Sequence, residues 1–259
     1  MLPEINVWRA HFEHHAWRSR QVPAELGDEL TAEARRAIGA SLATFQLGEQ
    51  SNGAHLIAAT RRFAEQHAGA DADTLVLIMQ LLVHEEHQHA WLLRSFMQRH
   101  AIPRKERDWT QLAFRFLRRL GGFELGVHVL IAAELIGIVY YRALEAATGC
   151  EQLRALCRTM VADELAHVGF EAQLLLTLQA RRPAPVRALL RAAHRAFFNT
   201  TALIVWLTHR RVFDRNGQRR EAFLRLCRAQ YAFHLGVPAL ARPSGSAPAG
   251  SRLAGGPYA

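Results

Sequence analysis

Two Glu-x-x-His steps constrain the fold of this chain more than any other feature of its sequence. They span Glu86–His89 and Glu164–His167, and an isolated glutamate stands in an apolar helical stretch before each, at Glu49 and Glu134. Residues three positions apart share one face of an α-helix, so each step directs a carboxylate and an imidazole to the same place. The sequence therefore predicts four helices that bring four carboxylates and two imidazoles together inside a bundle.

The chain from Leu30 to about Leu235 predicts an all-α protein. Ala, Leu, Arg and Glu dominate there, and apolar residues recur at intervals of three and four without the alternation typical of strands. Four core helices are expected over residues 31–67, 71–100, 123–147 and 150–180, followed by amphipathic helices over 185–212 and 218–235. Between the second and third core helices, Asp108 is expected to cap a short helix.

The sequence predicts four segments along the chain. Residues 1–30 are an N-terminal extension, 31–180 the four-helix bundle, 181–235 a pair of helices packed outside it, and 236–259 a disordered tail rich in Pro, Gly, Ser and Ala. Short turns near Gly69 and Gly149 predict two antiparallel hairpins, and the longer connection between the hairpins is a crossover.

The glutamates lie at matching heights in these hairpins. Glu134 is 15 residues before Gly149 and Glu164 is 15 residues after it, which places both about 22 Å along their helices at about 1.5 Å per residue. In the first hairpin the corresponding glutamates differ by about one turn, which helix tilt can absorb. All the candidate side chains can therefore reach one level of the bundle.

Carboxylates buried at that level are costly unless a cation compensates them. Carboxylate oxygens together with two imidazoles suit iron or manganese better than metals that prefer thiolates. The sequence therefore predicts a dinuclear metal site. Its expected ligands are Glu49, Glu86, His89, Glu134, Glu164 and His167. The simpler alternative is a polar helix face around His87, which leaves the two glutamates in apolar stripes unexplained.

An acidic residue stands directly before each motif glutamate. A ligating imidazole usually donates its second N–H to a carboxylate, which fixes its tautomer and orientation. We expect Asp163 to pair with His89 and Glu85 to pair with His167 across the hairpins. The alternative is that both acids are solvated.

The pattern Glu49, Glu86-x-x-His89, Glu134, Glu164-x-x-His167 makes residues 31–180 resemble the ferritin-like di-iron carboxylate superfamily. This superfamily includes acyl-carrier-protein desaturases, ribonucleotide reductase small subunits, arylamine N-oxygenases, aldehyde deformylating oxygenases and rubrerythrins. The resemblance implies a ferritin-like four-helix bundle with one long crossover, here with two additional C-terminal helices. It also implies that Glu86 and Glu164 bridge two iron ions, with the histidines as terminal ligands.

The chain departs from several branches of that superfamily. Ferritins lack the doubled step, no Cys-x-x-Cys pair supplies a rubredoxin module, and Met160 stands where arylamine N-oxygenases carry a third histidine. Many oxygenases place a hydroxyl residue one turn after the third-helix glutamate. Gly137 and Ile138 occupy that turn here, which predicts a roomier pocket.

The expected pocket residues are Gly53, Gly137, Ile138 and Tyr141. Tyr141 is expected to pack in the core, with a redox-active role as the alternative. Glu171 faces the site as a neighbour of the ligands or a solvated acid, with an additional ligand as the alternative. His11 and His15 have the spacing of zinc ligands, but without a third ligand they are expected on the surface.

The composition of the chain limits the kinds of partner that it is expected to bind. The formal net charge of +9 comes almost entirely from arginine and fits either a solvated basic surface or attraction to an acidic partner. No nucleic-acid motif is present, so no nucleic acid is expected. The apolar run 127–141 is shorter than the roughly 20 residues of a membrane span, and the first residues do not resemble a signal peptide. Three cysteines without a paired motif indicate buried thiols and a cytoplasmic location.

The resemblance implies a non-haem di-iron oxidoreductase that activates O2 to oxidise an organic substrate, either a small molecule or a carrier-bound group. Two iron ions are the expected cofactor, with manganese or a mixed pair left open. An external electron donor is expected, and a homodimer is one expected assembly. The alternatives are a rubrerythrin-like peroxide-scavenging or metal-handling protein and, in a different class, a metal-free helical bundle used for interaction.

Overall fold

The computed structural model of the chain describes residues 4–16, 26–51 and 53–236, and it contains no strand within these ranges. The predicted all-α class is confirmed. The helices are α1 (Ile5–Ala16), α2 (Ala32–Glu49), α3 (Ala54–His67), α4 (Ala72–Arg99), α5 (Trp109–Leu120), α6 (Phe123–Ala147), α7 (Glu151–Ala180), α8 (Ala184–Thr208), α9 (Arg210–Arg215) and α10 (Arg220–Leu235).

Two side-chain caps fix where helices begin. The Thr31 hydroxyl accepts a hydrogen bond from the Ala34 amide at the start of α2. The Asp108 carboxylate accepts one from the Thr110 amide, 3.0 Å away, at the start of α5. Each bond satisfies an amide that has no partner within its own helix, which confirms the expected cap at Asp108.

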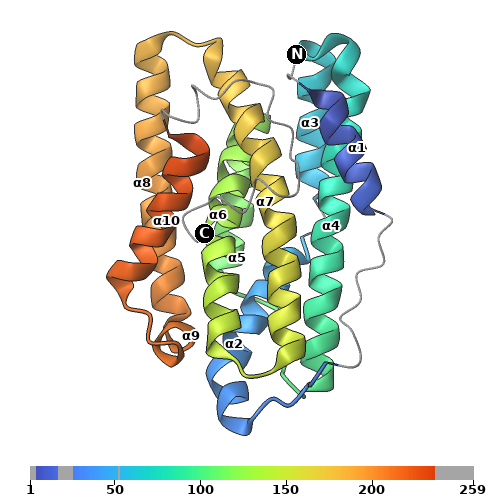
Figure 1. The fold of residues 1–259 in the computed structure, drawn as a ribbon. Helices are drawn as coiled ribbons and strands as arrows, with labels where there is room; N and C mark the ends of the chain where they lie inside the picture. Colours follow the sequence, from blue (N-terminus) through green and yellow to red (C-terminus); the bar gives the residue numbers. More distant parts are fainter. Residues whose placement is uncertain (1–3, 17–25, 52, 237–259) are drawn as a thin grey trace.

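The core is a helical bundle in which α2 and α3 together fill one position and α4, α6 and α7 fill the others (Figure 1). Both α2 and α3 pack on α4, α4 packs on α7, and α7 packs along α6, which in turn contacts α2 and α3. The turn at 148–150 makes α6 and α7 antiparallel neighbours. The connection through α5 joins the end of α4 to the start of α6.

The predicted continuous helix over 31–67 is wrong. The helix is interrupted between Glu49, where α2 ends, and Ala54, where α3 begins. Gly53 has a φ of +61°, in the left-handed region that favours glycine, and a Cβ there would lie 2.6 Å from both Cγ atoms of Val83. The backbone at Gly53 therefore packs directly on α4, and Glu49 becomes the last residue of its helix.

Helix α6 is the core helix of the bundle. Its length and apolar composition pass the test for a membrane span, but 83% of its most apolar 18-residue window is buried inside the protein. Packing against α7 and the helices around it accounts for this composition. The described residues thus contain no clear membrane span.

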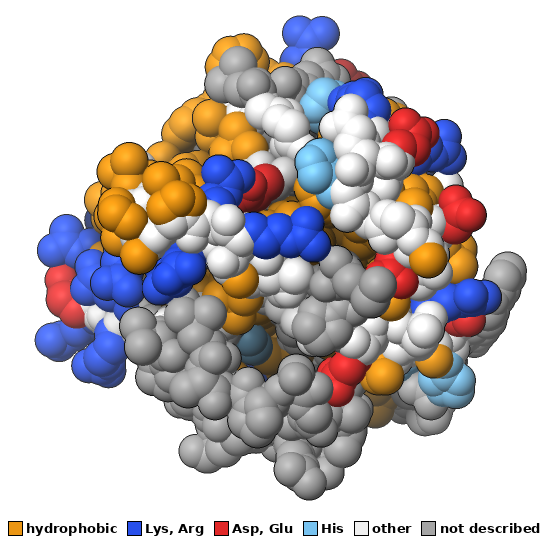
Figure 2. Space-filling view, turned by 90° about the horizontal axis from the view of Figure 1, so that it is seen from above, with side chains coloured by type: hydrophobic (Ala, Val, Ile, Leu, Met, Phe, Trp, Pro, Cys, Tyr) orange, Lys and Arg blue, Asp and Glu red, His pale blue; other side chains and the backbone are white. Residues whose placement is uncertain are grey.

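The remaining helices cover the bundle. Helix α1 packs along α4, and its buried Trp8 and Phe12 contact Phe170 of α7. The predicted helix over 185–212 is divided into α8 and α9, and α8 and α10 pack on α6 and on each other. Seen from one end of the bundle, Lys and Arg side chains stand beside exposed hydrophobic side chains (Figure 2). The predicted tail over 236–259 lies outside the described residues, apart from Gly236.

Candidate metal centre

The six expected ligands converge near the middle of α4, α6 and α7 and at the end of α2. Their candidate ligand atoms form two groups, and within each group these atoms lie within 4.8 Å of one another. One group is Glu49, Glu86, His89 and Glu164, and the other is Glu86, Glu134, Glu164 and His167. Glu86 and Glu164 belong to both groups. Each group could hold a metal ion, and the two sites would share two carboxylates.

Both imidazoles are oriented by a carboxylate behind them. His89 Nε2 lies 3.0 Å from Oδ2 of Asp163, and His167 Nε2 lies 2.9 Å from Oε2 of Glu85. These are the two pairs expected from the sequence. An Nε2–H that donates to a carboxylate leaves the Nδ1 lone pair for the interior of the cluster, because a neutral imidazole carries one N–H.

The inward Nδ1 atoms face the shared carboxylates. His167 Nδ1 is 3.3 Å from Oε1 of Glu86 and 3.6 Å from Oε2 of Glu164. His89 Nδ1 is 3.5 Å from Oε1 of Glu164 and 3.7 Å from Oε1 of Glu86. All four side chains therefore point at one small volume between α4 and α7.

Several atoms of the cluster are buried without a hydrogen-bond partner in the described part of the chain. They are both carboxylate oxygens of Glu134, Oε1 of Glu86, Oε2 of Glu164 and Nδ1 of His167. Buried polar atoms are normally satisfied, so a group of orphaned acceptors that face one another is unusual. A cation held between these side chains would supply the missing partners.

Burial and mutual repulsion perturb the carboxyl groups strongly. Burial, followed by the charge of Glu171, raises the pKa of Glu134 well above its usual value. Burial and the charge of Glu86 likewise raise the pKa of Glu164. Burial alone would raise the pKa of Glu86, but the neighbouring imidazoles of His167 and His89 outweigh it and lower that pKa to about 2.

Glu49 is held by Tyr141. The phenol donates a hydrogen bond of 2.6 Å to Oε1 of Glu49, so Tyr141 does more than fill core space. Burial and the neighbouring charges of Glu49 and Glu164 raise the pKa of Tyr141 well above its usual value, so the phenol keeps its proton. Tyr141 thereby orients the one candidate ligand that stands at a helix end.

Glu171 is fully buried, which excludes the solvated alternative. It lies outside both four-residue groups, and its two oxygens have no hydrogen-bond partner among the described residues. Burial raises its pKa well above the usual value. Glu171 is thus a buried neighbour of Glu134 in which burial favours the protonated form.

Helix α1 covers the histidine side of the cluster, which the sequence reasoning missed. Phe12 is fully buried and stacks on the His167 ring with centroids 5.8 Å apart. His15 Nδ1 lies 3.9 Å from Oδ1 of Asp163. His11 and His15 are half-buried rather than on the surface. The apolar residues of α1 recur at three and four, a signal that could have identified a packed helix.

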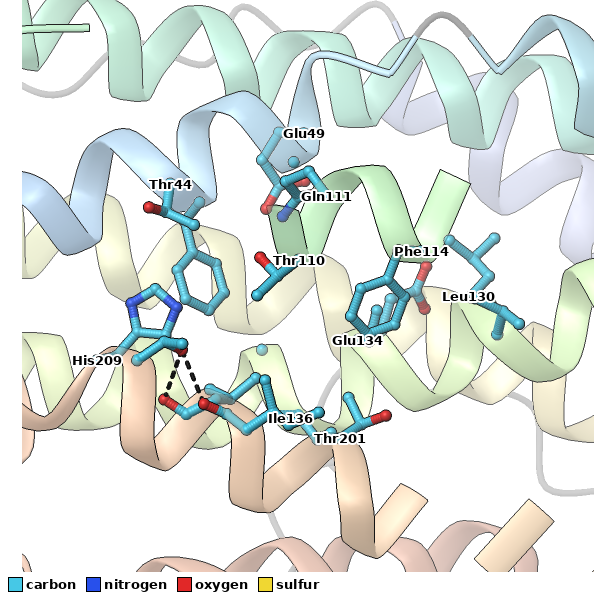
Figure 3. A pocket seen from close by; sticks show the side chains of 18 of the residues that line it. Thr44, Glu49, Thr110, Gln111, Phe114, Leu130, Glu134, Ile136, Thr201 and His209 are labelled. Carbon is cyan, nitrogen blue, oxygen red and sulfur yellow. Dashed lines mark hydrogen bonds between the residues drawn. The ribbon is translucent and has the colours of Figure 1, made fainter. Parts of the chain in front are cut away.

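A cavity of about 120 Å³ adjoins the carboxylate side of the cluster. Glu49, Glu86, Glu134 and Glu164 all line it, and the remaining wall is mostly apolar, with Phe114 of α5 and Val205 of α8 among its residues. Figure 3 shows Glu49 and Glu134 with the surrounding side chains of α5, α6 and α8. The sequence reasoning placed the C-terminal helices outside the bundle, yet α8 supplies one wall of this cavity.

Two of the four expected pocket residues lie on this wall. Gly137 and Tyr141 line the cavity. Ile138 does not, because it is fully buried in the core, and Gly53 does not, because it packs on Val83 at the helix break. No hydroxyl residue stands one turn after Glu134, but threonines from other helices, including Thr201 of α8, line the cavity.

His209 adds a polar group at the far end of the cavity. Its Nδ1 atom lies 2.7 Å from the Ser41 hydroxyl, which fixes the ring. Burial lowers the pKa of His209 to about 4, so the ring is neutral at physiological pH. Apart from the cluster carboxylates, none of the described residues that line the cavity therefore presents a charged side chain to a ligand.

No family model matches this chain. Comparisons with curated proteins and with solved structures likewise found no match.

Proposed function

We propose that the cluster binds two iron ions and that the protein is a non-haem di-iron oxidoreductase that uses dioxygen to oxidise an organic substrate. The observation that carries this proposal is the sharing of Glu86 and Glu164 by two ligand groups. Shared carboxylates are typical of dinuclear centres in ferritin-like helical bundles, which supports the proposal. A manganese pair or a mixed pair fits the same donor set.

Charge balance supports two divalent ions. The four ligand glutamates carry a charge of −4 when ionised, and two divalent cations carry +4. An ion in the group of Glu134 and His167 leaves Glu49 and His89 to a second ion, because those two residues belong only to the other group. Asp163 and Glu85 hold the histidines so that each Nδ1 stays available to a cation.

The cavity supports oxidation of a substrate over simple metal storage. Reduced iron bound at such a centre supplies electrons that activate dioxygen. The residues of the chain then have three tasks: the apolar wall excludes water, the cavity positions a substrate group beside Glu49 and Glu134, and Tyr141 orients Glu49. An apolar, uncharged group of about six carbons matches a volume of this size, because a cavity of about 150 Å³ accommodates benzene.

Anaerobic reconstitution with Fe(II), followed by metal analysis of the desalted protein, tests the centre. We expect about two equivalents of iron per chain and loss of most of it in the Glu164→Ala/His167→Ala variant. His84→Ala is the matched control, because this exposed histidine lies on α4 and hydrogen-bonds Gln88 away from the cluster. Retention of less than about half an equivalent by the wild-type protein would contradict the proposal and favour a metal-free bundle.

A second measurement separates the two metal-binding alternatives. The reduced, iron-loaded protein is exposed to O2 with and without small apolar compounds, and consumption of O2 and formation of oxidised product are followed. Product formation supports the oxidoreductase. Rapid turnover of H2O2 without any organic compound, together with no product, would instead identify a peroxide scavenger.

A further inference from the structure

Helix α5 differs from an ordinary surface helix because it exposes large apolar side chains on the face that points away from the cavity. Its inner face, with Thr110 and Phe114, lines the cavity. Its outer face carries Trp109, Leu112 and Phe116, whose exposed fractions are 60%, 57% and 60%. These three residues are spaced by three and four positions and therefore form one stripe, here called the α5 apolar face.

Exposure of this apolar face requires an explanation. Single exposed apolar residues are common, but three large ones aligned on one helix mark a surface that binds something. The neighbouring helix α8 adds to the apolar surface, because it contacts α5 through the rings of Phe114 and Phe197 and exposes Leu207 to 58%.

Basic residues flank the start of this helix. Arg104 and Arg107 are exposed just before α5, whereas Lys105 is held by Asp108 at 2.9 Å. Arg211 is exposed at the start of α9, just beyond the end of α8, where Thr208 and His209 share the cavity wall with Thr110. An apolar stripe of Trp, Leu and Phe beside arginines is the pattern of helices that lie in the headgroup region of a bilayer.

We propose that the α5 apolar face docks on an anionic lipid bilayer, with Trp109, Leu112 and Phe116 in the interfacial region and the flanking arginines at the headgroups. Charge complementarity favours this occupant over a second copy of the chain. Two copies that met through this face would bring their arginines together on proteins of net charge +9, whereas an anionic surface attracts them. The proposal is independent of the metal centre, because none of the docking side chains contributes a candidate ligand.

Vesicle co-sedimentation of the full-length chain tests the docking. We expect binding to mixed phosphatidylglycerol–phosphatidylcholine vesicles, weak binding to pure phosphatidylcholine, and a decrease as salt is added. The Trp109→Ala/Leu112→Ala/Phe116→Ala variant should lose about tenfold or more in vesicle partitioning. Trp91→Ala is the matched control, because Trp91 is exposed to 59% on α4 and should leave partitioning unchanged.

Two further measurements distinguish a loss of docking from a folding defect in the triple variant. The Arg104→Glu/Arg107→Glu variant, which leaves the apolar stripe intact, should lose binding to anionic vesicles. Fluorescence of a Trp91→Phe variant should shift to shorter wavelength on vesicle addition more than that of a Trp109→Phe variant. Absence of wild-type binding to anionic vesicles would overturn the proposal, as would equal binding by the triple variant. A concentration-dependent dimer that the triple variant abolishes, seen by light scattering without vesicle binding, would reassign the face to self-association.

Discussion

His89 Nε2 on α4 lies 3.0 Å from Asp163 Oδ2 on α7, so a residue outside the ligand set fixes the ring of a candidate ligand. The same relationship recurs between His167 and Glu85 at 2.9 Å. Each pair joins α4 to α7 in opposite directions. The two helices are therefore tied together on both sides of the cluster, and the positions of Glu86 and Glu164 are set by the same contacts.

Asp163→Asn should weaken metal binding by about 10- to 100-fold while leaving the helices intact, because the amide preserves shape but removes the charge that orients His89. Competition with a chelator measures the affinity, and circular dichroism checks the fold. Asp73→Asn is the control, since Asp73 is an exposed aspartate near the start of α4. An affinity equal to that of the wild-type protein would show that Asp163 does not position His89.

In the metal-free protein, Glu134 should contribute a loss of stability as the pH rises from about 4.5 towards neutrality, opposed below about pH 6.5 by buried histidines such as His209, whose pKa is lowered to about 4. Burial raises the pKa of Glu134, so the folded state holds a proton that the unfolded state releases, and the stability present below the unfolded pKa is lost as pH increases. The slope is about 1 kcal/mol per pH unit for one such group. Glu86 has a lowered pKa and acts in the opposite sense only at more acidic pH.

Urea unfolding of chelator-treated protein at several pH values measures this dependence. Glu134→Gln should remove the Glu134 contribution and stabilise the metal-free protein near neutral pH, because the amide carries no charge to bury. Glu151→Gln, at an exposed position in α7, is the control and should leave the slope unchanged. Equal pH dependences for Glu134→Gln and the wild-type protein would rule out the raised pKa of Glu134 as a contribution.

Gly137→Leu should fill the cavity without disturbing the metal centre. A Cβ at Gly137 would meet only Cε2 of Tyr141, at 3.9 Å, so the added side chain has room to extend along the wall. Calorimetry with benzene should show binding to the wild-type protein, weaker binding to Gly137→Ala and none to Gly137→Leu. Iron content should remain at the wild-type value in all three proteins, and the helix should gain up to about 1 kcal/mol from loss of glycine.

Gly53→Ala should destabilise the protein by about 2–5 kcal/mol. The left-handed backbone costs about 1–2 kcal/mol for a residue with a Cβ, and contact with Val83 at 2.6 Å adds overpacking of about 1–3 kcal/mol. Gly69→Ala is a matched control, because Gly69 also has a positive φ, +54°, but no atom within 4 Å of the added Cβ. The Gly69→Ala variant should lose only the stability that the left-handed backbone costs a residue with a Cβ, about 1–2 kcal/mol. If denaturant unfolding shows that both variants lose the same free energy of unfolding, the contact with Val83 does not contribute to the effect of Gly53→Ala.

The positions of Glu86, Glu164 and their histidines were predictable because helix geometry alone sets which residues share a face. The pairing of Asp163 and Glu85 with the histidines was predictable as well, from the one-residue offset on the same helices. Both inferences needed only local periodicity and the antiparallel order of the helices. The structure places all six candidate ligands as that reasoning required.

Other features depend on information that local periodicity does not carry. The break after Glu49 falls in a Ser-Asn-Gly sequence typical of turns, but the apolar periodicity continues on both sides and masks it. The packing of Phe12 on His167 joins residues far apart in the chain. Helix α8 forms a wall of the cavity because the C-terminal helices pack back onto α6. The local sequence around Thr201 does not predict this packing.

Glu49 differs from the other candidate ligands because it ends its helix, whereas the others lie within the continuous helices α4, α6 and α7. Helix ends fray more readily than helix centres, since their last carbonyls lack intrahelical partners. We expect amide hydrogens near Glu49 to exchange faster than those around Glu164. An ion would then enter or leave the cluster at the Glu49 corner, at a rate set by local opening there and not by unfolding of the bundle.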